Sequence, residues 1–214
     1  MIVDIHTHQS FISAYPAIRN IEFSASETIL QSTETDLFSI GIHPWYVDEI
    51  TTTSFLNLEK WANDKRVVAI GECGLDKNSI SSLEQQIFVF KKHAELSELI
   101  RKPLIVHCVG CYNELFEIKK DIQPLQKWIL HGFRGKPELA KRALKEGCSL
   151  SFGDHYNVES VLQTPIDKLF VETDESPLKI DELYKRLSEI KLCTINELNA
   201  GWLLIDSQIE KHNY

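Results

Sequence analysis

The sequence predicts an α/β fold built on parallel strands, and two observations lead to this prediction. Short apolar runs recur along the whole chain, and a polar or amphipathic segment follows each of them, as in parallel strands joined by crossover helices. Hydrophobic residues make up 43% of the 214 residues, which is enough to bury a sizeable core. Because no linker, repeat or low-complexity segment interrupts the pattern, we expect a single domain over residues 1–214.

Eight segments are predicted to be strands, because each is a short apolar run bounded by polar or turn residues. In chain order they are Ile2–Ile5, Asn20–Phe23, Leu37–Ile42, Val67–Gly71, Leu104–His107, Trp128–His131, Cys148–Phe152 and Leu169–Thr173. Asn20–Phe23 has the weakest apolar pattern of the eight. No apolar run is long enough to cross a bilayer, so we expect no membrane span.

Helices are predicted where apolar residues recur every three or four positions behind a capping residue. Leu83–Ile100 has this pattern after a possible capping box of Ser81 and Glu84, and Pro137 opens a second helix that runs to Lys145. A capping box of Thr194 and Glu197 is expected to begin the last helix. The first crossover, residues 11–31, has no long amphipathic pattern, so we expect it to be shortened.

These elements could form either a closed barrel or an open doubly wound sheet, and their spacing leaves both possible. The chain has no G-x-G-x-x-G after its first strand and no lysine-containing phosphate loop, which argues against the common nucleotide-binding sheets. Residue types that bind metals stand at the predicted strand ends instead: His6, His8, Glu72, His107, His131 and Asp174. Barrel enzymes build their active sites at this end of their strands, so the pattern favours a barrel.

The spacing of His6 and His8 has a mechanical consequence. Successive side chains of a strand point to opposite faces, so two residues that are two positions apart point the same way. Both imidazoles can therefore bind one ion. Alone, such a pair is weak evidence, because two polar residues can also follow a strand without binding a metal.

The charge balance limits the class of ligand. Lysine and arginine total 23 and aspartate and glutamate 31, so the formal net charge is −8. Such a surface repels polyanions, whereas most non-specific nucleic-acid binders have a basic face. A phosphate-bearing substrate would need a local positive charge, and nothing in the sequence indicates an obligate protein partner.

The cysteines and the first residues bear on location. Five cysteines, an odd number in a chain of this size, fit thiols in a reducing compartment better than a disulfide framework. We expect the C-x-x-C of Cys108 and Cys111 to be plain thiols. Residues 1–4 lead directly into an apolar strand without the basic and cleavage regions of a secretory signal, so a cytoplasmic location is expected.

Six motifs together carry a resemblance to a known family. They are H-T-H at 6–8, G-I-H-P at 41–44, G-E-C-G-L-D at 71–76, V-H-C at 106–108, H-G-F at 131–133 and E-T-D at 172–174. In order and spacing, from residue 1 to about residue 177, the chain resembles the TatD family of metal-dependent hydrolases. The resemblance implies a distorted TIM barrel, a centre of two divalent metal ions and hydrolysis of phosphodiester bonds, typically in DNA.

The resemblance also implies roles for the individual residues. One metal would be held by His6, His8 and Asp174, the second by His107 and His131, and Glu72 would bridge both. Glu72 and Asp174 would be catalytic, with Asp174 able to accept a proton from the attacking water. Imidazole and carboxylate ligands do not distinguish Zn, Mn, Mg and Fe, although they suit zinc, manganese or iron(II) better than calcium.

Other residues have two interpretations each. His43 could line the pocket or stiffen a turn, and Glu172 could orient a metal ligand or form a salt bridge. His155 is expected in a surface loop, and His93 and His212 are expected to be solvated. Trp45 and Tyr46 could cover a ligand, although hydrophobic packing is the more common fate of such residues.

The chain departs from the family pattern where the family places phosphate-binding groups. It has Gln9 and Ser10 after the first motif, Val109 in place of an arginine, and Arg134 in place of a serine, which makes Arg134 a candidate substrate-binding residue together with His43. One extra residue follows Asp174, and segment 178–183 lacks the expected arginine.

Three classes of function stay open on the sequence alone. The first is hydrolysis of a phosphodiester, and the acidic surface favours short DNA over a long polyanion. The second is metal-dependent hydrolysis of a phosphomonoester or an amide. The third is a metal-binding protein with little turnover.

Overall fold

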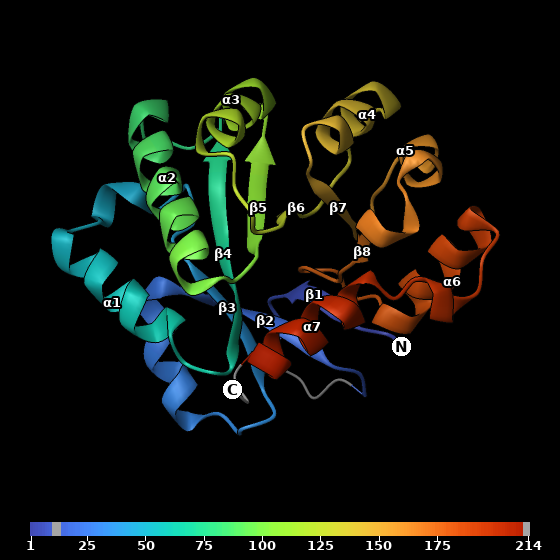
Figure 1. Cartoon of the computed structure of the whole chain (residues 1–214), viewed down its shortest axis with the longest axis horizontal. Coiled ribbons are helices and arrows are strands. Elements are labelled where there is room, and N and C mark those ends of the chain that lie inside the picture. Colours follow the sequence, from blue (N-terminus) through green and yellow to red (C-terminus); the bar gives the residue numbers. More distant parts are fainter. Residues whose placement is uncertain (10–13, 212–214) are drawn as a thin grey trace. The chain divides into compact units, whose positions relative to one another are not determined.

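The computed structural model describes residues 1–9 and 14–211 (Figure 1). These residues contain the strands β1 (Asp4–Thr7), β2 (Ala17–Glu22), β3 (Leu37–Gly41), β4 (Val67–Asp76), β5 (Leu104–Val109), β6 (Trp128–Leu130), β7 (Ser149–Phe152) and β8 (Leu169–Val171). The strands follow one another in the sheet as they do in the chain, from β1 to β8. Thr7 at the end of β1 also forms a parallel bridge with Asp174, which lies just after β8. This is the topology of a (β/α)8 barrel, and it confirms the predicted fold class.

Helices connect most successive strands. The α-helices are α1 (Thr52–Ala62), α2 (Leu83–Ile100), α3 (Tyr112–Ile122), α4 (Pro137–Lys145), α5 (Val158–Gln163), α6 (Ile180–Lys191) and α7 (Ala200–Lys211). Short 3-10 helices are η1 (Phe23–Gln31), η2 (Val47–Glu49), η3 (Ile166–Lys168) and η4 (Ile195–Glu197). Within the described part of the chain, no helix combines the length and the apolar character needed to traverse a bilayer.

The chain divides into two compact units, which are described separately below. The first unit comprises Met1–Arg19 and Ile129–Tyr214, and the second comprises Asn20–Trp128. The expectation that residues 1–214 form a single domain stays a prediction.

In the first unit, the C-terminal helices hold strand β1 in place. The hydroxyl of Tyr184 on α6 donates to the Val3 carbonyl at 2.9 Å and accepts from the Val3 N–H at 3.2 Å. Gly201 on α7 faces the same strand, where an added Cβ would lie only 3.0 Å from Ile5 Cγ2. The strand that carries His6 and leads to His8 is therefore fixed by residues nearly two hundred positions away.

In the second unit, strands β4 and β5 form the centre. All ten residues of β4 are buried, and α2 runs alongside this strand (Figure 1). The ring of Trp128 packs edge-on against Phe90 of α2 at a centroid distance of 5.0 Å, and the Lys119 ammonium lies over its face. This buried framework fixes the positions from which the side chains of β4 and β5 project.

Several predicted element boundaries were wrong by a few residues. Strand β4 runs five residues beyond the predicted end, so Glu72 lies inside a strand and not after it. The capping box of α2 is Ser82 with Gln85, since the hydroxyl of Ser81 instead donates to Asp48 at 2.7 Å. The predicted capping box of Thr194 caps the 3-10 turn η4, and α7 begins only at Ala200.

The first crossover is short, as predicted. Between β1 and β2 the described residues, 8–9 and 14–16, contain no helix, and residues 10–13 lie outside the described part of the chain. The connection after β2 is the 3-10 helix η1, which includes non-helical backbone at Ala25.

His93 corrects a further expectation. It was expected to be solvated, but its side chain on α2 is fully buried, and its Nε2 accepts a hydrogen bond from the Ile42 N–H at 2.9 Å. A 3.6-residue period placed it in a helix correctly, whereas only the packing of α2 against β4 shows which face it occupies. His212 lies outside the described residues.

Candidate metal centre

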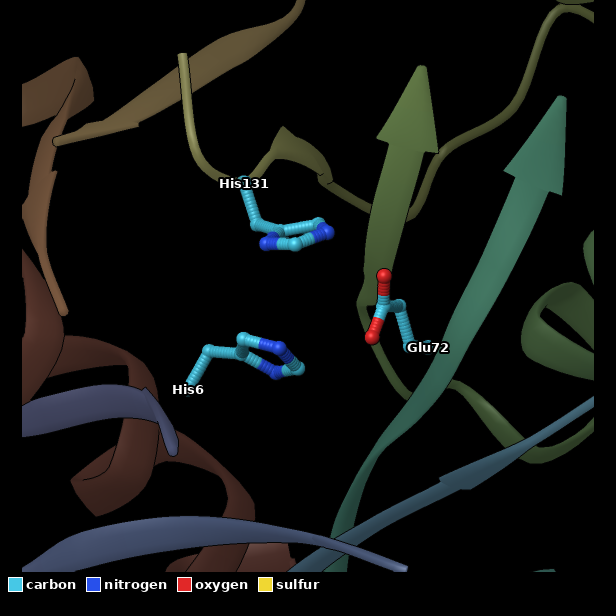
Figure 2. A group of neighbouring side chains, drawn as sticks. All are labelled: His6, Glu72 and His131. Carbon is cyan, nitrogen blue, oxygen red and sulfur yellow. The ribbon is translucent and has the colours of Figure 1, made fainter. Parts of the chain in front are cut away.

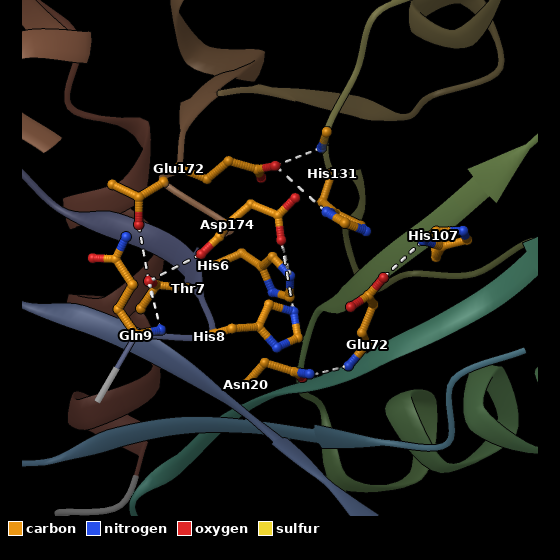
Figure 3. A network of polar contacts seen from close by, with 12 residues as sticks. His6, Thr7, His8, Gln9, Asn20, Glu72, His107, His131, Glu172 and Asp174 are labelled. Atoms are coloured by element: carbon orange, nitrogen blue, oxygen red, sulfur yellow. Dashed lines mark hydrogen bonds and ion pairs between the residues drawn. The ribbon is translucent and has the colours of Figure 1, made fainter. Parts of the chain in front are cut away.

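The first unit gathers His6, His8 and Asp174 into one group. The Nε2 atoms of His6 and His8 lie 3.7 and 3.6 Å from the same oxygen of Asp174 (Figure 3). The two imidazoles are perpendicular, with their centroids 5.0 Å apart. One ligand atom from each of the three side chains lies within 4.8 Å of the others, which is close enough to hold one metal ion.

Backbone pairing between the end of β1 and the segment after β8 produces this group. The Asp174 N–H donates to the His6 carbonyl at 3.0 Å, and the His8 N–H donates to the Asp174 carbonyl at 3.1 Å. Asp174 has a positive φ of 53°, a conformation that Asp tolerates better than most residues. The predicted convergence of His6 and His8 on one face is thus confirmed within this unit.

His131 and Glu172 form a second pair in the same unit. Figure 2 shows the rings of His6 and His131, whose centroids are 4.4 Å apart. An oxygen of Glu172 lies 3.4 Å from His131 Nδ1 and accepts from the Gly132 N–H at 2.5 Å. Burial raises the pKa of Glu172, but the hydrogen bond from His131 and the nearby imidazoles outweigh burial, so the pKa lies below its ordinary value. Of the two interpretations of Glu172, an orienting partner for His131 is the one that this contact supports.

A cavity of about 300 Å³ adjoins these residues within the first unit. Asp174 and Glu172 lie on its wall, together with Arg134 and His155. His155 lies in a loop after β7, as expected, and its side chain is exposed. Arg134 is also exposed, and it contributes a basic side chain to this wall three positions after His131 in the sequence.

Two of the departures from the family pattern contact each other in this unit. The Gln9 side-chain amide donates to the carbonyl of Ser176, so residues after β1 and β8 are tied directly. The segment that follows Asp174 is therefore anchored by a residue that the sequence alone marked only as a substitution.

The second unit gathers Glu72, His107 and His43. Glu72 Oε1 lies 2.7 Å from His107 Nδ1 and 3.3 Å from His43 Nε2, and the Glu72 N–H donates to the Asn20 side chain at 2.7 Å (Figure 3). Ligand atoms of these three side chains also lie within 4.8 Å of one another. Of the two interpretations of His43, lining the site is the one that its contact with Glu72 supports.

Asp76 belongs to the same group and was missed as a site residue. Its Oδ2 lies 3.1 Å from His107 Nε2 and accepts a hydrogen bond from the Trp45 indole at 2.8 Å. Burial raises the pKa of Asp76, but hydrogen bonds from the Asn78 N–H, His107 and Trp45 lower it below the ordinary value. The alternation of a strand could have found it, because residues 72 and 76 of one strand point the same way.

The close approach of β4 and β5 requires a glycine between these two carboxylates. A Cβ on Gly74 would lie 1.9 Å from the His107 carbonyl oxygen, so any side chain there would push the strands apart. Gly74 thus allows Glu72 and Asp76 to flank the same imidazole.

The chemistry of both groups fits divalent metal ions. A neutral imidazole carries one N–H and donates to one carboxylate only, yet both nitrogens of His107 face carboxylate oxygens. The imidazole nitrogen without a hydrogen therefore faces a carboxylate oxygen lone pair to lone pair, and the two atoms repel each other. A divalent cation bound by both atoms would remove this repulsion. The softer ligands are turned elsewhere, since the Cys73 thiol points to the Ile105 carbonyl and burial raises its pKa. Cys108 and Cys111 are buried free thiols, as expected.

Comparison with known proteins defines the family. Residues 3–198 match the family model described as TatD related DNase. The chain belongs to the TatD-related DNase family. This membership confirms the resemblance that the six motifs carried.

Two relatives show how much of this TatD-related chain is similar to named proteins. An uncharacterized metal-dependent hydrolase of Buchnera aphidicola is 36% identical over 148 residues, which cover 64% of this chain and 55% of the relative. The 3'-5' ssDNA/RNA exonuclease TatD of Erwinia amylovora is 32% identical over 145 residues, covering 63% of this chain and 56% of the relative. The chain thus matches little more than half the length of these relatives.

A solved structure supports the fold of the TatD-related chain. The crystal structure of the TatD homolog YjjV from Escherichia coli superposes with a TM-score of 0.81 at 18% identity and covers 97% of both chains. At this identity the likeness bears on the fold alone.

Proposed function

We propose that this chain is a metal-dependent hydrolase that cleaves phosphodiester bonds at the ends of short single-stranded nucleic acids, DNA above all. The observation that carries the proposal is that each unit of this TatD-related chain holds a group of three imidazole and carboxylate side chains close enough to bind a metal ion. The Erwinia relative, named as a 3'-5' ssDNA/RNA exonuclease, supports this class of substrate.

The proposed ligands are those that the family motifs assign. His6, His8 and Asp174 would hold one divalent ion, His107 and His131 a second, and Glu72 would serve both. A carboxylate suits a shared position because each of its two oxygens can bind a separate cation. Bound divalent ions would lower the pKa of water and offset the charge of the phosphate despite the net charge of −8.

The protein side chains have roles of their own in this proposal. Asp174, partly exposed on the wall of the cavity, accepts the proton from the attacking water. Glu172 orients His131, and Asp76 orients His107, each through a carboxylate to imidazole contact. Arg134 contacts a phosphate oxygen of the substrate from the rim of the cavity.

Two measurements on the full chain test the proposal. Metal analysis of protein purified without chelators should find about two divalent ions per chain and also identify them. A panel of phosphodiester, phosphomonoester and amide substrates with added Mn²⁺, Zn²⁺ or Mg²⁺ should show turnover of the phosphodiesters above all. Turnover confined to the monoester or the amide would move the activity to those classes, and bound metal without any turnover would leave a metal-binding protein.

A further inference from the structure

Two aromatic side chains of the second unit lie exposed beside the candidate ligands. Trp45 is 53% exposed and Tyr46 is 41% exposed, directly after His43 and Pro44. Of the two interpretations of these residues, hydrophobic packing and covering a ligand, their exposure does not fit full hydrophobic packing. Exposed single aromatics are ordinary, so their orientation and neighbours decide what they can do.

The indole N–H of Trp45 is engaged in a hydrogen bond, which fixes the orientation of the ring. Its Nε1–H donates to Asp76 Oδ2 at 2.8 Å, and the same oxygen lies 3.1 Å from His107 Nε2. The ring meets that of His43 edge to face, at an interplanar angle of 89° and a centroid distance of 5.1 Å. The hydrogen-bonding edge is thus occupied, and the rest of the indole is apolar ring.

We propose that Trp45 is a stacking surface for a nucleobase that adjoins the phosphodiester cleaved at Glu72 and His107. This inference rests on the proposed function and extends it to the recognition of the substrate. A flat ring with a fixed orientation can stack on any of the bases, because every base has an aromatic face. Tyr46, whose ring centroid lies 6.1 Å from that of His43, is a second exposed aromatic side chain next to this imidazole.

The charge of the chain explains why such a surface is needed. The net charge is −8, and Val109 and segment 178–183 lack the arginines that the family pattern places there to bind a phosphate backbone. Affinity for a short oligonucleotide must therefore come in part from uncharged contacts. Base stacking on an aromatic side chain supplies such a contact without sequence preference.

A competing role for Trp45 is to orient Asp76 only, and two substitutions separate the roles. Trp45→Phe keeps an aromatic ring but removes the N–H that binds Asp76, whereas Trp45→Ala removes both. A stacking surface predicts that the Phe variant retains most of the binding and the Ala variant loses it. An orienting role alone predicts that the two variants are equally impaired.

The decisive experiment combines the variants with substrates that lack one base. Five-nucleotide single strands carry an abasic residue at each position in turn, and kcat/KM is measured with Mn²⁺ for the wild type, Trp45→Ala and Trp45→Phe. Loss of the stacked base should lower kcat/KM of the wild type by about 5- to 150-fold, and should change Trp45→Ala little. Phe88→Ala is a matched control, because Phe88 is 58% exposed on α2 and contacts Phe55 instead.

A binding measurement keeps the outcome independent of turnover. The probe is an oligonucleotide with the fluorescent base 2-aminopurine at the stacked position. Its fluorescence should be quenched on binding to the wild type and to Trp45→Phe, but not to Trp45→Ala. Equal quenching by all three, or equal sensitivity to base loss in wild type and Trp45→Ala, would overturn the inference. If no oligonucleotide is hydrolysed at all, the proposed function fails, and quenching still decides whether the base stacks.

Discussion

The hydroxyl of Thr173 donates a hydrogen bond to the buried carboxylate of Asp4 with an oxygen to oxygen distance of 2.6 Å. The Thr173 N–H donates to the other oxygen at 3.0 Å. Asp4 begins β1 and Thr173 precedes Asp174, so this contact ties together the two segments that carry His6 and Asp174. Burial raises the pKa of Asp4 to about 7, although these hydrogen bonds lower it.

Replacing Thr173 by valine should test this contact. Thr173→Val keeps the shape but removes the donor, so at pH 8, where Asp4 is ionised, the free energy of unfolding should fall by ~2 kcal/mol. The loss should be smaller at pH 5, where the protonated carboxyl depends less on donors. Urea unfolding of the variant and of Thr53→Val, an exposed position on α1, measures the difference. Equal losses in the two variants would contradict the role given to this contact.

Glu72→Ala should lower both metal content and activity. The variant removes a carboxylate that is 6% exposed and contacts two imidazoles, so the proposed shared ligand is lost. Metal analysis beside activity on a phosphodiester checks the result. Cys108→Ser, next to His107 but on the opposite face of the strand, should leave both nearly intact. Retention of the full metal content by Glu72→Ala would exclude Glu72 as a ligand.

His93 should make stability depend on pH. Burial lowers the pKa of its imidazole to about 4 from the ordinary 6.5, so between these values the unfolded chain binds a proton that the folded protein does not. The contribution is fully present above pH 6.5 and is lost as pH falls toward 4, by up to ~1.4 kcal/mol per pH unit. Chemical unfolding across this range should therefore show a flatter pH dependence for His93→Gln. Parallel curves for variant and wild type would show that His93 does not titrate in this way.

Arg134→Ala should weaken binding of the substrate more than it slows the reaction. Arg134 and Asp174 line the same cavity, and a hydrogen bond to a charged phosphate is worth enough to raise KM by about tenfold. Steady-state kinetics on a short oligonucleotide separates KM from kcat. Arg142→Ala makes the same change of charge at an exposed position on α4 and should leave KM unchanged. A fall in kcat alone would instead place Arg134 in the chemical step.

Binding of oligonucleotides should depend only weakly on salt. With few basic side chains to follow a backbone, about one to three phosphates are neutralised, so the slope of log K against log salt should be about −1 to −2. Short strands should bind nearly as well as long ones. A steep increase of affinity with strand length, or its collapse between about 50 and 200 mM salt, would reveal an extended basic track.

Much of the candidate site was predictable from the sequence because strands alternate and motifs are local. The period of two places His6 and His8 on one face, and the segment ends place His131 and Asp174 after their strands. The prediction that His107 ends its strand was wrong, because β5 continues to Val109. The same period could have added Asp76 to Glu72. Asn20 and Asp4 had no such signal, because their partners Glu72 and Thr173 are distant in the sequence and are reached only through strand pairing.

The sequence by itself indicated most strands, the longest helix and the chemical types of the ligands, since these depend on short-range periodicity and on residue identity, whereas the order of the strands in the sheet came from the structure. Only the tertiary structure decided which side chains are buried and which neighbour they meet. His93 became a buried acceptor because α2 packs against β4 and the Ile42 N–H meets its imidazole there, whereas Trp45 donates its indole N–H to Asp76 and stays half exposed. Burial and hydrogen bonding depend on residues far apart in the chain, and no local pattern encodes those contacts.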